Sequence, residues 1–258
     1  MKILITGAKG GIGYLTALTL AEKGHKVYLT CHTNKQLKKV KEKIGKQKNI
    51  TVLKLDITSE KDRLRVLDLD IDCLFNNAAV ALGGSIIEAD MDYVRENFEV
   101  NVFSSFRLLQ IVLRNMIEKN KGRIIVMSSL AGIYPVSFIG SYSSSKAALI
   151  KITETLRREV KLIDKNIKFC LIEPGFYYTG FNQVMFDEAY DTLNIYFKNK
   201  KNVIINRGKL IHKFIEKKNF DSIVKKIIKA INSTGNKFIY RAPFLQVVGA
   251  KIYSLFFE

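Results

Sequence analysis

The chain begins with a short apolar run that passes through a glycine-rich turn into a helical pattern. Residues 1–6 have strand length, a helical pattern covers 12–23, and the turn between them carries Gly7, Gly11 and Gly13. Glycine permits a tight turn and a close approach of the backbone to a ligand, and the N–H groups at a helix N-terminus favour an anion. This order of elements predicts a strand-turn-helix unit that binds a nucleotide phosphate. Its spacing differs from the phosphate loop of nucleotide hydrolases, which has Gly-Lys-Ser/Thr after the second glycine.

Apolar runs of strand length alternate with helical patterns along the whole chain. Strands are expected near 1–6, 26–31, 50–55, 71–75, 122–128, 167–172 and 237–240, and helices near 12–23, 34–44, 59–67, 90–118, 141–164 and 217–231. This alternation predicts a parallel sheet with right-handed crossovers and helices on both faces. We therefore expect 1–258 to form a single doubly wound, Rossmann-type α/β domain of about seven strands, with ligands at their carboxyl ends.

The composition is compatible with one large core and argues against several classes of function. Apolar residues make up 47% of the 258 residues, and no repeat or linker divides them. The formal net charge is +18, but the lysines are dispersed, so we do not expect nucleic-acid binding. The basic surface favours anionic partners, which include a phosphate-bearing cofactor.

Cysteine and histidine are too few and too far apart to predict a metal site. Cys31, Cys73 and Cys170 each lie in or beside an apolar strand, and we expect them to be buried free thiols. The first predicted strand starts at Met1, so we expect no secretory signal. No apolar run reaches the ~18 residues that span a bilayer. Together these observations predict a cytoplasmic location.

A tyrosine and a lysine, four residues apart, stand at the start of the helical pattern near residue 141. Tyr142 and Lys146 therefore share one helical face, and their polar ends can reach the same space. A free tyrosine titrates near 10, and a neighbouring positive charge lowers its pKa. The pair is typical of a proton-transfer device.

Polar residues follow the predicted strands at the points where those strands end. In a doubly wound sheet all of these points lie at one edge, so the topology predicts one composite site there. Its expected members are Gly7–Gly13, Cys31–Asn34, Asp56, Asn76–Ala79, Ser128–Ser129 and Glu173–Thr179.

Five sequence motifs follow these strand ends in order. They are T-G-A-K-G-G-I-G at 6–13, L-D-I-T at 55–58, N-N-A-A at 76–79, Y-S-S-S-K at 142–146 and P-G-F-Y-Y-T at 174–179. With these motifs, and with Asn101 and Ser129 at the remaining catalytic positions, the chain closely resembles the classical short-chain dehydrogenase/reductase family up to about Thr179. Ser129 precedes Tyr142 by the family's usual interval, 142 − 129 = 13 residues. The family usually has glycine where Ala79 stands, and often where Ser104 stands, and both departures are mild.

The resemblance implies an enzyme that transfers a hydride between a nicotinamide cofactor and an alcohol or carbonyl carbon. In reduction Tyr142 donates a proton to the carbonyl oxygen, and in oxidation it accepts one. Lys146 lowers the pKa of Tyr142 and holds the nicotinamide ribose. Ser129 hydrogen-bonds the substrate oxygen, and Asn101 holds a water that links Lys146 to solvent.

Each of these residues also has a structural alternative. Tyr142 and Lys146 could form a surface pair, Ser129 could cap a turn, and Asn101 could be a polar residue within a helix. Ser128 is a weaker catalytic candidate than Ser129, because its interval to the tyrosine is one residue too long.

The strand ends also predict the cofactor, for which we expect a preference for NADP(H) over NAD(H). An acidic residue at the end of the second strand would bind the adenosine ribose and repel a 2′-phosphate, but that position is Cys31. The resemblance places His32 where relatives carry a phosphate-binding arginine, with Lys9 and Lys35 nearby, and implies that Asp56 binds the adenine amino group. Asp56 could instead cap the next helix. The expected cofactor-binding residues are Gly7, Lys9, Gly11, Ile12, Gly13, His32, Asp56, Ile57, Asn77, Ala78, Tyr142, Lys146, Pro174, Gly175 and Thr179.

Residues 1–180 thus form the expected cofactor-binding and catalytic core, and about 181–215 the expected substrate lid. Ser129, Tyr142, Phe176, Tyr177 and Phe181 are the expected substrate-binding residues. With Met185, Phe186 and Tyr190, the aromatic residues line an apolar pocket or form the buried face of a core helix. A pocket of this kind predicts a bulky apolar substrate.

The tail, about 242–258, is apolar and basic and has apolar residues near helical spacing. Three interpretations stay open: closure over the substrate pocket, a dimer surface, and a helix lying on a membrane. The residues concerned are Phe244, Leu245, Val248, Ile252, Leu255 and Phe256.

We expect a homodimer or a homotetramer. Two other functions stay open beside the dehydrogenase. One is a redox-sensing protein that binds NADP without turnover, and the other is a sugar-nucleotide epimerase or dehydratase on a related fold.

Overall fold

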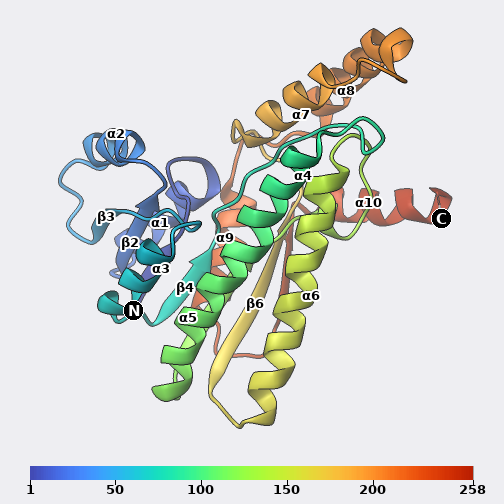
Figure 1. Ribbon diagram of the computed structural model, residues 1–258. Coiled ribbons are helices and arrows are strands. Elements are labelled where there is room, and N and C mark those ends of the chain that lie inside the picture. The colour runs from blue at the N-terminus through green and yellow to red at the C-terminus, as the bar shows by residue number, and fades with distance from the viewer. Residues whose placement is uncertain (258) are drawn as a thin grey trace.

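Seven parallel strands form the centre of the molecule, and helices cover both faces of the sheet (Figure 1). The computed structural model describes residues 1–257, without the side chains of 212, 253 and 255–257. The strand order is β3-β2-β1-β4-β5-β6-β7, and every neighbouring pair is parallel. The strands are β1 (Lys2–Ile5), β2 (Lys26–Cys31), β3 (Ile50–Lys54), β4 (Cys73–Asn76), β5 (Gly122–Met127), β6 (Ile167–Pro174) and β7 (Ile239–Ala242). The prediction of a doubly wound, Rossmann-type sheet is confirmed.

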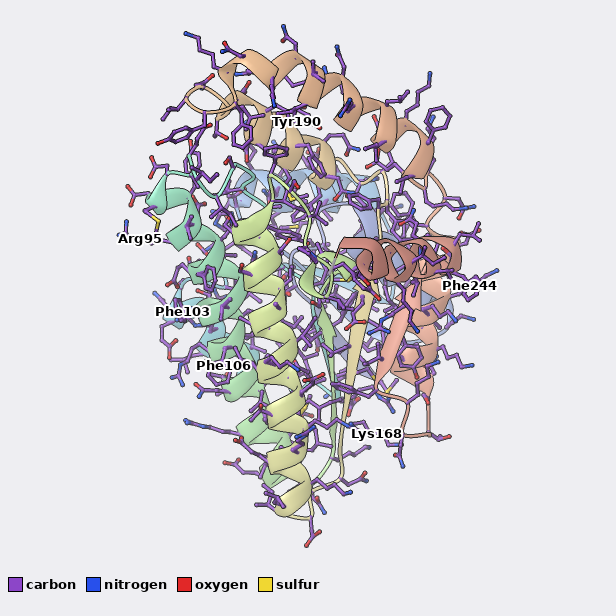
Figure 2. The ribbon with its side chains drawn as sticks, turned by 90° about the vertical axis from the view of Figure 1, so that its right-hand side faces the viewer. Arg95, Phe103, Phe106, Lys168, Tyr190 and Phe244 are labelled. Carbon is purple, nitrogen blue, oxygen red and sulfur yellow. The ribbon has the colours of Figure 1, made fainter. Side chains whose placement is uncertain are left out.

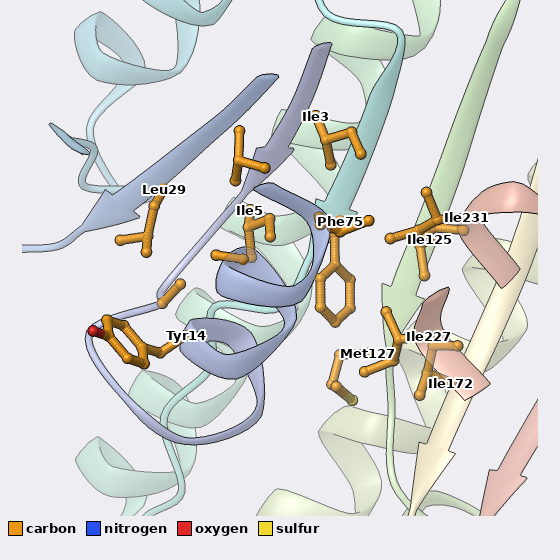
Figure 3. Packing of buried hydrophobic residues seen from close by; sticks show 14 of the residues in the cluster. Ile3, Ile5, Tyr14, Leu29, Phe75, Ile125, Met127, Ile172, Ile227 and Ile231 are labelled. Atoms are coloured by element: carbon orange, nitrogen blue, oxygen red, sulfur yellow. The ribbon is translucent and has the colours of Figure 1, made fainter. Parts of the chain in front are cut away.

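Two apolar clusters, one on each face of the sheet, form the core. The central strands are buried on both faces, so successive residues enter opposite clusters: Ile3 and Ile5 lie in one and Leu4 lies in the other. Helices α1 (Gly11–Glu22), α2 (Asn34–Ile44) and α9 (Asp221–Asn232) cover the first cluster. Figure 3 shows that cluster, in which Ile231 of α9 lies beside Ile125, and Ile227 of the same helix lies near Met127 and Ile172.

The opposite face is covered by α5 (Ser105–Glu118) and α6 (Gly140–Leu162), which stand side by side in Figure 1. Short helical turns, α3 (Glu60–Leu64) and η1 (Arg65–Leu69), pack at its edge. The three cysteines are free and buried, as predicted, because each lies on a central strand.

Three segments differ from the sequence-based expectation or refine it. The helix expected over 90–118 is α4 (Met91–Phe98) and α5, joined by the π-helical segment η2 (Glu99–Ser104). The expected lid is two helices, α7 (Phe181–Asp191) and α8 (Lys201–Ile215), which lie at one end of the sheet (Figure 1). The tail forms α10 (Phe244–Phe257), and the side chains of Leu255 and Phe256 lie outside the described residues. The division into core, lid and tail stays a prediction.

Within the described part of the chain, we find no helix that is both long and apolar enough to cross a membrane.

Candidate active site

A cavity of about 1450 Å³ opens at the carboxyl ends of the strands. It is lined by the loops that follow β1, β2, β3, β4, β5 and β6, together with α7. The predicted site residues that line it are Gly7, Lys9, Gly11, Ile12, Gly13, His32, Asp56, Ile57, Asn77, Ala78, Ser129, Tyr142, Lys146, Pro174, Gly175, Phe176, Tyr177, Thr179 and Phe181. The topology therefore gathers almost the whole predicted set around one space. Asn101 does not line it, although it is one of the expected catalytic residues, and some of the wider set expected at the strand ends, such as Cys31, do not line it either.

The glycine turn is held against the ends of two other strands. Gly7 has a φ of +63°, and a Cβ there would lie 2.7 Å from the Cα of Ala78. Gly11 has a φ of +57°, and a Cβ there would lie 3.2 Å from the side chain of Thr179. A side chain at either position would have a strained backbone, and at Gly7 it would also collide with the backbone of Ala78.

The turn is braced by residues that follow β1 and β4. The hydroxyl oxygen of Thr6 accepts hydrogen bonds from the N–H groups of Asn77 and Ala78, both at 2.9 Å. The side-chain amide of Asn77 donates to the carbonyl oxygen of Thr6 at 2.8 Å. Asn77 therefore organises the cavity wall, and Thr6 is a supporting residue that the sequence reasoning missed. Its position directly before the first glycine was the available signal.

The N-terminus of α1 fits a phosphate group. No side chain among the described residues caps this helix, and its first turn contains no acidic residue. The first N–H groups of the helix, beside Gly11 and Gly13 in the cavity wall, are therefore available to an anion without competition from a carboxylate. The residues present fit a dinucleotide pyrophosphate.

At the far end of the cavity, His32 and Asp56 lie against each other. The Nε2 atom of His32 is 3.3 Å from a carboxylate oxygen of Asp56. The N–H and hydroxyl of Thr58 donate to the other oxygen of Asp56 at 3.0 and 2.7 Å. Burial opposes ionisation of Asp56, but these hydrogen bonds and the charges of His32 and Lys54 hold its pKa below the usual value. The carboxylate thus caps the following turn and also faces the cavity.

Of the residues near His32 in the sequence, some line the cavity and others do not. Cys31 is fully buried in the core and does not line the cavity. Lys35 does not line it either, whereas Lys9 does. Gln36, which the sequence reasoning missed, lines the cavity and accepts a hydrogen bond from the N–H of His32 at 3.2 Å. Its place in the first turn of the helix after β2 was the signal.

Tyr142 and Lys146 lie close together in the cavity wall, and both are buried, at 7% and 2% exposure. The lysine Nζ is 5.7 Å from the centre of the tyrosine ring and donates to the carbonyl oxygen of Met127 at 3.2 Å. The side chain of Ser129 hydrogen-bonds that of Tyr142, and its Oγ also accepts from the N–H of Ala131 at 3.1 Å. Ser129 therefore both caps a turn and touches the phenol.

The ionisation of this pair differs from the expectation that Lys146 lowers the pKa of Tyr142. Burial raises the pKa of Tyr142 to about 12, and the hydrogen bond from Ser129 opposes this only in part. Burial lowers the pKa of Lys146 to about 8. In the protein without ligand the pKa of Tyr142 therefore moves opposite to the expected direction, because burial disfavours the phenolate and Lys146 is not among the causes that act on it. With a pKa near 8, Lys146 is still mostly charged at neutral pH.

Asn101 lies in the π-helical segment, fully buried and next to the cavity wall. Its Oδ1 accepts from the N–H of Val80 at 2.9 Å, and its Nδ2 donates to the carbonyl oxygen of Val80 at 2.9 Å and to Ser145 Oγ at 3.0 Å. The side chain thus fastens the loop after β4 to the helix that carries the tyrosine and the lysine. The water relay stays a prediction.

Asn97 repeats these contacts one helical turn earlier. Its Oδ1 accepts from the N–H of Leu82 at 3.2 Å, and its Nδ2 donates to the carbonyl oxygen of Leu82 at 2.9 Å and to Ser141 Oγ at 2.8 Å. The sequence reasoning missed Asn97. The sequence contained one indication of its role: Asn97 and Asn101 are four residues apart, as are Ser141 and Ser145.

Only part of the aromatic stretch faces the cavity. Phe181 and Met185 line it, and the ring of Phe181 lies 5.9 Å from the ring of Tyr142. Phe186 and Tyr190 do not line it and pack in an apolar cluster that Met185 also joins, with their ring centres 6.2 Å apart. Both predicted alternatives are therefore realised, pocket lining for some residues and helix core for others.

Tyr177 borders the cavity but directs its hydroxyl away, toward α9. The ring stacks on Phe220 with centres 5.9 Å apart, and the hydroxyl lies 2.7 Å from Ser222 Oγ. This packing gives Tyr177 a structural role and makes it a weaker candidate for substrate contact than Phe176 or Phe181.

Comparison with known proteins identifies the family. The family model described as short chain dehydrogenase matches residues 1–189, well over half of the chain. This chain belongs to that short-chain dehydrogenase family.

Its relatives in the family are named as reductases and dehydrogenases. A 3-ketodihydrosphingosine reductase of Bacteroides thetaiotaomicron is 35% identical over 185 residues, which are 69% of this chain and 65% of the relative. An NADP-dependent 3-hydroxy acid dehydrogenase of Schizosaccharomyces pombe is 32% identical over 211 residues, 77% of this chain and 80% of the relative. The match thus spans just under two thirds of the Bacteroides reductase.

Among solved structures, a short chain dehydrogenase/reductase from Burkholderia phymatum in complex with NAD has a TM-score of 0.81. The alignment covers 97% of this chain and 91% of the other, at 20% identity, and supports the short-chain dehydrogenase fold.

The match to the family model ends at 189, and residues beyond it make long-range contacts with the matched part of the chain. The carboxylate of Glu88, in the loop before α4, accepts hydrogen bonds from four consecutive N–H groups of residues 194–197, at 2.9 to 3.1 Å. This contact fixes the segment that joins α7 to α8. It connects residues more than a hundred positions apart, so no local pattern predicted it.

A second long-range contact joins α10 to the cavity wall. The side chain of Gln246 accepts from the N–H of Phe176 at 2.6 Å and donates to the carbonyl oxygen of Ile215, the last residue of α8, at 2.7 Å. Gln246 occupies the space that a side chain at Gly175 would need. Helix α10, the end of α8 and the cavity wall are therefore connected by this one side chain in this short-chain dehydrogenase.

Proposed function

We propose that this protein is an NADP(H)-dependent oxidoreductase that interconverts a carbonyl group and an alcohol on a bulky apolar substrate. The observation that carries the proposal is the arrangement of Ser129, Tyr142 and Lys146 in the same cavity as the glycine turn. An acid-base group thereby lies beside a space that suits a dinucleotide. Family membership and the names of the relatives give independent support.

In the reductive direction, bound NADPH would supply a hydride to the carbonyl carbon of the substrate. Tyr142 donates its phenolic proton to the carbonyl oxygen, and the hydroxyl of Ser129 hydrogen-bonds that oxygen as negative charge develops. The ammonium of Lys146 stabilises the resulting phenolate and holds ribose hydroxyls. The burial of Tyr142 and Lys146 excludes water, which strengthens these electrostatic interactions. In oxidation Tyr142 accepts the proton.

The preference for NADP(H) is supported by the residues at the adenosine end of the cavity. Lys9 and His32 line the wall and can face a 2′-phosphate, and the position at the end of β2 that would carry an acid is Cys31. One relative is named as NADP-dependent. We expect a higher kcat/KM with NADPH than with NADH, and a smaller ratio in His32→Ala. Faster turnover of NADH by the wild type would refute the preference.

The bulky apolar substrate is supported by the walls around Tyr142. Phe181, Met185 and Ile139 line this part of the cavity, and about 1450 Å³ is a large space for a cofactor together with a substrate. A relative named as a 3-ketodihydrosphingosine reductase supports the same substrate class.

The test is a panel of long-chain and polycyclic ketones and alcohols, followed by the absorbance of NADPH. We expect turnover with several apolar compounds, and a loss on the order of a hundredfold or more in Tyr142→Phe with unchanged NADPH binding. NADPH binding without turnover of any compound would favour the redox-sensing alternative. The epimerase or dehydratase alternative has no support among the relatives reported above.

We further propose that α10 rests on an anionic membrane surface. Its outward face is apolar, with Phe244 at 76% and Leu245 at 75% exposure, followed by Val248 and Ile252. Figure 2 shows Phe244 at the outer edge of the molecule. The neighbouring stretch 198–218 has eight Lys or Arg and one Glu, a difference of +7. This charge complements anionic lipid beside an exposed apolar helix.

A homodimer or homotetramer and a cytoplasmic location stay parts of the proposal. Light scattering after size-exclusion chromatography measures the first, and cell fractionation measures the second.

A further inference from the structure

Helix α8 lies on the outside of α7, and none of its described side chains is buried. Its inner face meets the rest of the molecule through Ile204 and Ile205, which pack against the apolar cluster that includes Tyr190 of α7. The two helices also meet at Gly208, where a Cβ would collide with the hydroxyl of Tyr190. Figure 1 shows α8 at the outer edge of the molecule. The remaining faces of this helix are therefore open to the surroundings.

An apolar row runs along one of these open faces. Its members are at positions i, i+7, i+8 and i+11, which share a helical face, and they are Val203, Leu210, Ile211 and Phe214. Each of these side chains is more than half exposed, and Phe214 reaches 78%. Single exposed apolar side chains are ordinary, but a continuous apolar surface marks an interaction site.

Cations surround the apolar row. Lys209 and Lys213, at i and i+4, form the neighbouring row on α8. The whole stretch 198–218 holds eight Lys or Arg, and none of the ion pairs between described residues includes any of them. Its one acid, Glu216, faces α7, where the carboxylate accepts a hydrogen bond from the side chain of Gln183 at 2.5 Å. These cations are therefore available to an anion outside the protein.

An anionic lipid surface fits this combination better than other partners do. A helix with an apolar row beside lysines lies in the interface of a bilayer, where the apolar side chains enter the acyl boundary and the cations meet phosphate. A nucleic acid would use the cations but would leave the apolar row in water. A second copy would bring its own eight cations against the first, in a protein of net charge +18.

The end of α8 adjoins the start of α10. The hydrogen bond from Gln246 to the carbonyl oxygen of Ile215, at 2.7 Å, joins the two helices. Phe214 precedes Ile215 in the chain and is exposed. Phe244 and Leu245 precede Gln246, and both are exposed as well. Figure 1 shows both helices on the side of the molecule away from the N-terminus, so the apolar row continues toward the exposed face of α10.

We propose that α8 lies in the interface of an anionic bilayer and that the apolar substrate enters the cavity from the lipid. The proposal rests on the proposed function and adds the source of its substrate. Helix α7 lies between α8 and the cavity, because Tyr190 packs on α8 while Phe181 and Met185 line the cavity wall. Packed helix axes are about 8–10 Å apart, so a substrate that leaves the bilayer has a short path to the site. An apolar compound thereby avoids the cost of crossing water.

The chain contains no tryptophan, so a single introduced tryptophan reports on its own surroundings. Full-length Phe214→Trp is mixed with vesicles of equal parts phosphatidylglycerol and phosphatidylcholine, with Leu162→Trp, at the 83% exposed end of α6, as the matched control. We expect the emission of Phe214→Trp to move to shorter wavelength and to be quenched by lipids with brominated acyl chains. The emission of Leu162→Trp should not change. Adding Lys209→Ala and Lys213→Ala to Phe214→Trp should weaken vesicle binding about thirtyfold, or about 2 kcal/mol for two charges.

The route of the substrate is tested with a long-chain ketone dissolved in the same vesicles. Wild type should reduce this ketone at least tenfold faster than the variant with Lys209→Ala and Lys213→Ala, while both proteins reduce a short water-soluble ketone at equal rates. Equal rates with the ketone in the vesicles would overturn the route from the bilayer.

An emission of Phe214→Trp that the vesicles leave unchanged would overturn the whole inference. A shift that follows protein concentration in the absence of vesicles would assign the apolar row to a second copy and would overturn it as well. If vesicles shift the emission but no ketone is turned over, the proposed function and the substrate route fail together, and the lipid surface of α8 stands.

Discussion

Asn101 donates a hydrogen bond from its Nδ2 to the Oγ of Ser145 at 3.0 Å, across the boundary between two helices. Ser145 in turn donates to the carbonyl oxygen of Tyr142 at 2.7 Å. The π-helical segment is therefore connected to the backbone of the proposed proton donor by two hydrogen bonds. Asn97 and Ser141 form the matching contact one turn away.

This pairing predicts different effects for two similar substitutions. Asn101→Ala and Asn97→Ala each remove three hydrogen bonds, and each should lower the free energy of unfolding by about 2 kcal/mol, since buried partners are left unpaired. Asn101→Ala should also lower kcat more strongly, because its contact leads to Tyr142. Calorimetry and steady-state kinetics measure both effects. Equal loss of kcat in the two variants would contradict the positioning role of Asn101.

The contact between Glu88 and residues 194–197 predicts that Glu88 acts as a latch, which means that it holds the segment between α7 and α8 in place. Burial opposes ionisation of Glu88, but four backbone N–H groups hold its pKa below the usual value. Glu88→Gln weakens these charge-assisted bonds, so we expect a higher KM and faster proteolysis between α7 and α8. Glu118→Gln, at the exposed end of α5, is the matched control. Unchanged proteolysis in Glu88→Gln would exclude the latch.

The lowered pKa of Lys146 predicts that activity and stability change with pH in opposite directions. Its pKa is about 8 in the folded protein against an ordinary value of 10.5. Above pH 8 the folded protein loses this proton while the unfolded chain keeps it, so this group adds stability as the pH rises toward 10.5. Reduction should slow over the same range, because the ammonium beside Tyr142 is lost. Tyr142, with its pKa raised to about 12, opposes the gain only above its ordinary value of 10.

The measurement compares wild type with Lys146→Met in chemical denaturation and turnover between pH 7 and 10. We expect the difference in unfolding free energy between the two proteins to change with pH through this range. A wild-type rate that stays level through pH 8 would show that the charge of Lys146 is not needed.

The apolar face of α10 predicts binding to vesicles. Leu245→Glu places a charge on an exposed apolar position and leaves the contacts of Gln246 intact, so we expect weaker flotation with anionic vesicles. Leu162→Glu, at an 83% exposed position at the end of α6, is the matched control and should float like wild type. Equal flotation of both variants, or none in the wild type, would argue against the membrane surface and leave pocket closure or a dimer surface for this helix.

Several parts of the protein followed from the sequence alone. The alternation of strand and helix patterns predicted the parallel sheet, and the glycine turn and the interval between Ser129 and Tyr142 predicted what gathers at its edge. These patterns are local in the chain, and the rules of parallel sheets convert them into position. The ends of most strands and helices agreed within two or three residues.

Only the tertiary structure showed the pKa values of the site residues and the contacts that hold the neighbouring segments in place. The pKa values of Tyr142 and Lys146 depend on burial, which spacing along a helix does not reveal. The contacts of Glu88 and Gln246 join segments far apart in the chain. Sequence periodicity reports which face of an element is apolar, whereas such contacts depend on how whole elements pack, and so they could be found only in the folded protein.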